Sequence, residues 1–219
     1  MTISRKDAVR PYAVKACTLQ IKAADIAPDG AFSGYGSVFD VVDSGGDATR
    51  PGSFSASLSE RKASGDWPRM LLEHVARGEL VIALTPIGVW DEIAEDATGL
   101  RVKGHLVLDV PEARAVHALM KAGHPYGLSI GYETLRQTYA SADDVEQKYG
   151  FSPLAAMPFL PSGQVRMLDE VDLWEVSVVT FPMLKAARVD HVKTAVAERE
   201  AIRSLSAALA VRRAALARL

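Results

Sequence analysis

One serine in a short apolar run is the residue of this sequence best suited to covalent chemistry. Ser129 stands in Gly127–Tyr132, where apolar and small residues alternate as they do in a buried strand. Glycines two positions away on either side leave space around the hydroxyl, which a nucleophile needs when a substrate carbonyl approaches. The alternative is that the glycines allow close backbone packing and that Ser129 is a satisfied core hydroxyl.

A serine nucleophile needs a base, and the sequence offers five histidines. His74 ends an apolar run that begins at Met70, and apolar surroundings favour the neutral imidazole that a base requires. A structural histidine is the alternative for each of the five. The other four stand on a charged strand face, in a predicted helix, in a turn and in the tail: His105, His117, His124 and His191.

The acid of a triad is expected in the strand-like run 169–182, which is rich in carboxylates. Simple strand alternation places Glu175 on one face with Val171 and Leu173, and Asp172 on the other face. A carboxylate on an apolar face is costly to bury unless it is paired, so Glu175 should have a partner such as an imidazole. An ion pair with an arginine is the structural alternative.

Strands rather than helices must position these groups. The alternation of apolar residues predicts strands over 14–23, 31–41, 79–84, 87–93, 100–108 and 165–181, besides the run around Ser129. Because the strands follow one another without crossover helices, we expect an α+β protein, a mainly antiparallel β-barrel with helices packed outside.

Two helices and a tail complete the predicted organisation. One helix begins near Ser53 as its N-cap and ends at Gly65, and a second runs from Pro111 to Lys121. Residues 189–219 predict one long helix with an apolar stripe, so we divide the chain into a domain over 1–188 and a helical tail over 189–219. The stripe requires a partner surface, either the barrel or a second copy in a homodimer.

Composition narrows the function classes. With 219 residues, 48% hydrophobic and 24% charged, the chain is globular, and a net charge of -2 gives no reason to expect nucleic acid or an anionic membrane as partner. A single cysteine, Cys17, fits a reducing compartment. We find no apolar run that could cross a bilayer, no secretory signal, and no metal- or nucleotide-binding motif, so we expect no cofactor.

Seven sequence blocks, weak singly but specific in their order, resemble the prohead (procapsid maturation) serine proteases of tailed bacteriophages. The resemblance covers roughly residues 15–189. The blocks are Phe32–Phe39, Gly46-Asp47 with Pro51–Phe54, Met70–His74, Pro86–Trp90, Gly99–Gly104, Gly127–Tyr132 and Val171–Pro182.

The resemblance implies a serine endopeptidase with a fold similar to the herpesvirus assembly proteases, a closed barrel with outer helices. Such enzymes trim scaffold or the scaffold-like arm of the major capsid protein, and usually their own chain, inside the procapsid in the host cytoplasm. Matched by motif, Ser129 is the nucleophile and His74 the base. Glu175 matches the acidic position, with Asp172 second. Major capsid protein or scaffold is the implied partner, with no nucleic acid or membrane, and the tail could dock onto scaffold helices.

One block departs from the pattern of this family. Val75 follows the histidine where the family often has Asp, and Ala76–Thr85 intervenes before the next block. Either a loop beside the site is extended, or the histidine is held differently. Two other functions stay open: a catalytically silent capsid-assembly protein of the same fold, and a small serine esterase, which no nucleophile elbow between a strand and a helix supports.

Overall fold

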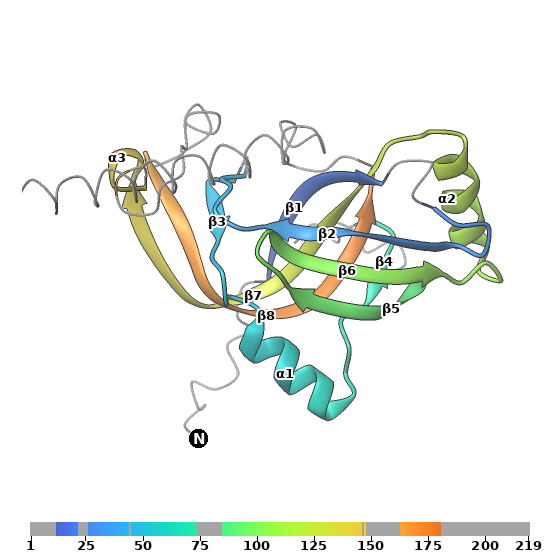
Figure 1. Ribbon diagram of the computed structural model, residues 1–219, viewed down its shortest axis with the longest axis horizontal. Coiled ribbons are helices and arrows are strands. Elements are labelled where there is room, and N and C mark those ends of the chain that lie inside the picture. The colour runs from blue at the N-terminus through green and yellow to red at the C-terminus, as the bar shows by residue number, and fades with distance from the viewer. Residues whose placement is uncertain are drawn as a thin grey trace, which may run out of the picture.

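The computed structural model describes residues 12–21, 26–43, 45–73, 85–145, 147 and 163–180, with the backbone alone for 12–21 and 142. Within these residues the chain forms two four-stranded sheets, which curl around a shared core (Figure 1). The strand orders are β1-β7-β8-β3 in one sheet and β2-β6-β5-β4 in the other.

The first sheet is built on a long hairpin of β7 (Tyr126–Ser141) and β8 (Gln164–Val179). β1 (Tyr12–Ile21) pairs antiparallel with the first half of β7, and β3 (Asp47–Thr49) pairs parallel with the start of β8. β7 is therefore a central strand where β1 lies beside it.

The second sheet is antiparallel throughout. β2 (Ala31–Val38) pairs with β6 (Gly99–Leu106), β6 with β5 (Pro86–Glu95), and β5 with the short β4 (Met70–Leu71). β2, β5 and β6 overlap the predicted strands over 31–41, 87–93 and 100–108, whereas the predicted strand over 79–84 lies outside the described residues.

The segment around β4 joins the two sheets. Arg69 and Leu72 form parallel bridges to Glu175 and Val178 of β8. The amide of Val176 donates to the carbonyl of Arg69 at 3.0 Å. β8 therefore pairs along one edge with β7 and along the other with β3 and then with the β4 segment.

Close packing between the sheets explains the glycines of Phe32–Phe39. A Cβ added at Gly36 would lie 3.0 Å from Cγ1 of Val176 and 3.3 Å from Cγ2 of Ile130. One added at Gly34 would lie 3.0 Å from a methyl carbon of Leu128. β2 can cross directly over the β7–β8 hairpin because these positions carry no side chain.

The helices are α1 (Ser55–Ser64), α2 (Pro111–Lys121) and the single turn α3 (Ala142–Asp144). The bounds of α2, with proline first, are as predicted. α1 ends at Gly65, whose φ of 76° is the left-handed conformation expected of a C-terminal glycine.

The predicted N-cap of α1 is wrong. Its N-cap residue is Phe54, which makes no side-chain cap. Glu95 of β5 replaces the cap, because its Oε1 accepts the amide of Phe54 at 2.8 Å and its Oε2 accepts the amide of Gly52 at 3.0 Å. Oε2 also accepts the hydroxyl of Ser55 at 2.9 Å. A carboxylate from a distant strand thus binds the N-cap amide, the amide two residues before it and the hydroxyl of the first helical residue.

The prediction of a mainly antiparallel β protein with helices outside is confirmed at the level of a curled, half-barrel sheet with two principal helices (Figure 1). The predicted long helix over 189–219, and with it the division at residue 188, lies outside the described residues. None of the helices in the described ranges is long and apolar enough to span a membrane.

Candidate active site

Ser129 lies within a central strand, not in a turn between a strand and a helix. In β7 it is paired with Ala16 of β1 on one side and with Ser177 of β8 on the other. It is fully buried, at 0% exposure. Because β7 is hydrogen-bonded along both edges here, the backbone of Ser129 is fixed.

The two faces of the β7–β8 hairpin differ in chemistry at this point. Leu128 and Ile130, which flank Ser129, belong to the apolar core between the sheets, as do their partners in β8. Ser129 therefore points to the opposite face. Ser177, directly across from it, and Glu175, across from Gly131, share this face with Ser129.

A β-bulge at Trp174 produces this arrangement. Glu175 pairs with Gly131, but Leu173 pairs with Tyr132, so Trp174 is an extra residue in β8. Leu173 and Val176 both belong to the core cluster, which an unbroken strand could not achieve. The expectation that Glu175 shares a face with Val171 and Leu173 is therefore wrong, since the bulge turns it to the face of Ser129.

Glu175 is buried, at 3% exposure, and its carboxylate is hydrogen-bonded within its own strand. The hydroxyl of Ser177, two residues on, donates to Oε2 of Glu175 at 3.1 Å. Strand period could have indicated Ser177, because residues two apart lie on one face, but the predicted site did not include it.

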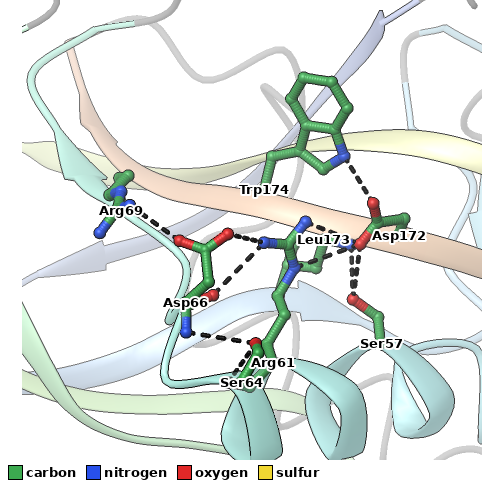
Figure 2. A network of polar contacts seen from close by, with 8 residues as sticks. All are labelled: Ser57, Arg61, Ser64, Asp66, Arg69, Asp172, Leu173 and Trp174. Carbon is green, nitrogen blue, oxygen red and sulfur yellow. Dashed lines mark hydrogen bonds and ion pairs between the residues drawn. The ribbon is translucent and has the colours of Figure 1, made fainter.

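Asp172, the second candidate acid, binds a different set of partners (Figure 2). Its Oδ1 accepts the hydroxyl of Ser57 at 3.0 Å and Nη2 of Arg61 at 2.8 Å, both from α1. Its Oδ2 accepts the indole N–H of Trp174 at 2.9 Å. Arg61 also pairs with Asp66 at 3.2 Å. Asp172 thus anchors α1 to β8, and this anchoring explains the residue without a catalytic role.

The three histidines within the described ranges make contacts away from Ser129. Nδ1 of His105 lies 3.2 Å from Asp91 on the exposed face of the second sheet. On α2, Nε2 of His117 donates to the carbonyl of Ala27 at 3.0 Å. The ring of His124 packs on Tyr126, with centroids 5.0 Å apart. The remaining two, His74 and His191, lie outside the described residues.

The residue before His74 is held at the end of β8. The amide of Glu73 donates to the carbonyl of Val178 at 2.8 Å. Its Oε1 accepts the amide of Thr180 at 2.8 Å and the Thr180 hydroxyl at 2.6 Å. Glu73 adopts a φ of 61°, which is uncommon for a residue other than glycine and marks a sharp change of chain direction. The chain that leads to the predicted base therefore runs beside the stretch of β8 that carries Glu175 and Ser177.

We find no group of three His, Cys, Asp or Glu side chains suited to a metal ion within the part of the chain that the structure describes. What the geometry brings together is one serine hydroxyl and one hydroxyl-bound carboxylate on adjacent strands of one face. These are two of the three groups that serine-based acyl transfer requires.

The arrangement of the curled sheets is similar to that of a solved phage capsid protease. The capsid assembly protease of bacteriophage T4 is similar in structure, with a TM-score of 0.53 over 80% of this chain and 100% of that chain, at 10% identity. This likeness concerns the fold alone.

The sequence comparisons then identify the family. The family model for caudovirus prohead serine proteases matches residues 17–201. The prohead protease of Enterobacteria phage HK97 is 30% identical over 177 residues, which cover 80% of this chain and 65% of that relative. The chain belongs to the caudovirus prohead serine protease family, as the seven sequence blocks predict.

Proposed function

We propose that this chain is a serine endopeptidase of phage prohead maturation in which Ser129 is the nucleophile, His74 the base and Glu175 the acid that orients the base. The observation that carries the proposal is the shared face of Ser129 and Glu175 on adjacent strands, in a chain of a serine protease family. Ser129 and Glu175 are diagonal neighbours in the β7–β8 ladder, and such neighbours lie roughly 7–8 Å apart, which leaves room for one imidazole between the two groups.

The proposed reaction is acyl transfer. His74 accepts the proton of the Ser129 hydroxyl while the oxygen forms a bond to the carbonyl carbon of the scissile peptide. Backbone N–H groups stabilise the resulting oxyanion. Collapse of the tetrahedral intermediate breaks the C–N bond, and the protonated imidazole donates its proton to the leaving amine. Water, deprotonated by the same imidazole, then attacks the carbonyl of the acyl-enzyme. This step releases the carboxylic acid product and regenerates the Ser129 hydroxyl.

Glu175 supports this chemistry by its burial. A buried carboxylate needs a cationic or hydrogen-bonding partner, and an imidazolium that forms during the reaction supplies positive charge. Its bond with the Ser177 hydroxyl holds one oxygen of the carboxylate in place. Asp172 is disfavoured as the acid because both of its oxygens already bind α1 or Trp174.

The proposed substrates are proteins of the immature shell. By analogy with the named relatives, the chain acts inside the procapsid in the host cytoplasm, on scaffold or the scaffold-like arm of the major capsid protein and on itself. The proposal also includes closure of the curled sheets into a herpesvirus-protease-like barrel. It further includes packing of the tail over 189–219 on the barrel, on a second copy or on scaffold helices.

The test combines processing with chemical labelling. Wild-type protein and Ser129→Ala are incubated with precursor capsid protein and, separately, with a fluorophosphonate probe followed by peptide mapping. We expect wild type to cleave and to be labelled at residue 129, and Ser129→Ala to do neither while it stays folded. Ser33→Ala, on the exposed part of β2, is the matched control.

Each opposite result identifies a different function. Processing by folded Ser129→Ala would exclude Ser129 as nucleophile. A folded wild-type chain that neither cleaves nor reacts would be a silent assembly protein, and turnover of small esters without cleavage of capsid protein would indicate an esterase.

A further inference from the structure

Ser177 contacts the carboxylate of the proposed acid and has no part in the triad itself. It is fully buried, lies directly across the ladder from Ser129, and donates to Oε2 of Glu175 at 3.1 Å. A buried, hydrogen-bonded serine on a strand face can be purely structural, so a role for Ser177 in the reaction depends on its neighbours.

The backbone that carries Ser177 and Glu175 is held from three directions. Between them, the amide of Val176 donates to the carbonyl of Arg69 at 3.0 Å, and the carbonyl of Val176 accepts the indole N–H of Trp90 at 3.2 Å. β7 pairs along the other edge. Because the backbone is fixed, the direction of the carboxylate depends on the side-chain torsions of Glu175 alone.

A glutamate has several such torsions, and its buried carboxylate is useful to an imidazole only in one orientation. Gly131, opposite Glu175 in the ladder, has no side chain that could restrain it. The Ser177 hydroxyl does restrain it, because a hydrogen bond to one oxygen also fixes the direction of the other.

We propose that Ser177 is a positioning residue, whose hydroxyl holds Oε2 of Glu175 and so fixes the orientation of the carboxylate on which the base depends. This inference rests on the proposed triad. Ser177 transfers no proton to the substrate and forms no bond with it; it acts through Glu175 on the rate of acyl transfer and not on the binding of the peptide.

The test is a set of steady-state measurements on the full chain with a quenched fluorescent peptide that spans a mapped cleavage site of the capsid protein. We expect Ser177→Ala to lower kcat by about ten- to a hundredfold, the loss typical of a hydrogen bond to a charged group, with KM within about twofold of wild type. Ser177→Thr, which keeps the hydroxyl on a strand-compatible side chain, should restore most of kcat.

A double-mutant cycle separates positioning from a structural role. In a Glu175→Ala background, Ser177→Ala should cause no further loss of kcat, because the residue that it positions is absent. The matched control is Ser37→Ala: Ser37 is likewise fully buried in a strand and hydrogen-bonded, at 2.8 Å to Thr49, but lies in β2. It should lower the unfolding temperature as Ser177→Ala does and leave kcat unchanged.

The outcomes keep this inference apart from the proposed function. If Glu175→Ala retains wild-type kcat, the triad is wrong and the positioning role fails with it. If Glu175→Ala is impaired but Ser177→Ala is not, or the two losses multiply in the double variant, Ser177 does not position the acid. Fluorophosphonate labelling at residue 177 in place of 129 would make Ser177 the nucleophile and overturn the inference. If Ser177→Ala does not fold, Ser177→Cys, with a weaker donor of similar size, should show an intermediate kcat.

Discussion

Two stretches of β8, one on each side of Trp174, differ in what their polar side chains bind. Before the bulge, Arg166 forms a bidentate pair with Asp47 of β3, and Asp172 binds Ser57 and Arg61 of α1. After the bulge, Glu175 and Ser177 bind each other and lie across from β7 residues of the proposed site. The first stretch holds neighbouring elements in place, and the second carries the proposed acid and its hydrogen-bond partner.

Burial separates the two stretches as clearly as their partners do. The Asp172 side chain is 35% exposed, whereas Glu175 is 3% exposed. An anchor between two surface elements tolerates solvent, while an acid that must hold an imidazole gains strength from its absence. The bulge brings the two carboxylates to the same face, and they differ in their surroundings: Asp172 binds α1 at a partly exposed position, whereas Glu175 is buried beside Ser177.

The largest effect is expected when the proposed acid loses its charge. Glu175→Gln should lower kcat by about a thousand- to ten-thousandfold, because a neutral amide neither holds the productive tautomer nor stabilises an imidazolium. Asp172→Asn, measured with the same peptide substrate, should leave kcat per folded molecule close to wild type. Equal effects of the two changes would remove the functional distinction between the stretches.

The converse effect is expected on stability. Asp172→Ala should lower the free energy of unfolding by about 1–2 kcal/mol, because Ser57 and Arg61 lose their acceptor at a partly exposed site. Urea unfolding measures it. Glu170→Ala is the control, since Glu170 pairs with Arg136 at 3.4 Å on the exposed surface of the same stretch. A loss no larger than that of the control would show that Asp172 does not anchor α1.

A third prediction concerns alkaline pH and Tyr132 of β7, which binds Asp47, the partner of Arg166 in the first stretch. Tyr132 donates to Asp47 at 3.2 Å, and burial, followed by the charges of Asp47 and Asp43, raises the pKa of its phenol well above the ordinary 10.0. Because the folded state holds this proton more tightly, its contribution to stability is complete below pH 10 and is lost as pH rises through the raised pKa.

Tyr132→Phe should therefore cost about 1 kcal/mol near neutral pH, the value of one hydrogen bond. The difference from wild type should shrink as pH rises above 10. Chemical unfolding at a series of pH values measures it. A constant difference across the alkaline range would mean that the pKa of Tyr132 is the same in the folded and unfolded states.

The smallest effect is expected at the N-terminus of α1, where Glu95 binds. Glu95→Gln should lower the free energy of unfolding by about 0.5–1 kcal/mol, since the helix N-terminus loses a charged cap. Glu92→Gln, an exposed position on the same strand whose partner is Lys103, is the control. If the two variants unfold alike, α1 depends on Asp172 and not on Glu95.

Local patterns in the sequence predict local structure here, and contacts across the chain account for what they miss. The strand around Ser129 and the helix Pro111–Lys121 follow from periodicity, proline and glycine. The face of Glu175 does not, because the bulge is set by register with β7 and not by the residues of β8. The cap supplied by Glu95 and the partners of Asp172 come from elements far away in sequence, so spacing alone could not reveal them.

The candidate site itself divides in the same way. Its residue types and family order pointed to Ser129 and Glu175, and the structure adds that the two share a face. Strand alternation could have placed Ser177 on the face of Glu175, but only its hydrogen bond to Glu175 distinguishes it from any buried serine. The assignment of His74 as base stays a prediction, because that residue lies outside the described part of the chain.

The position of β8 in the order of the chain has a consequence for how the protein is made. This strand pairs with β7, β3 and the β4 segment, and it follows all of them in sequence. A ribosome that has not yet released residue 179 therefore carries a nascent chain in which three elements lack their common partner. Under the proposed mechanism, a chain interrupted before residue 175 has its nucleophile but not its acid, so we expect it to cleave proteins far more slowly than the finished chain.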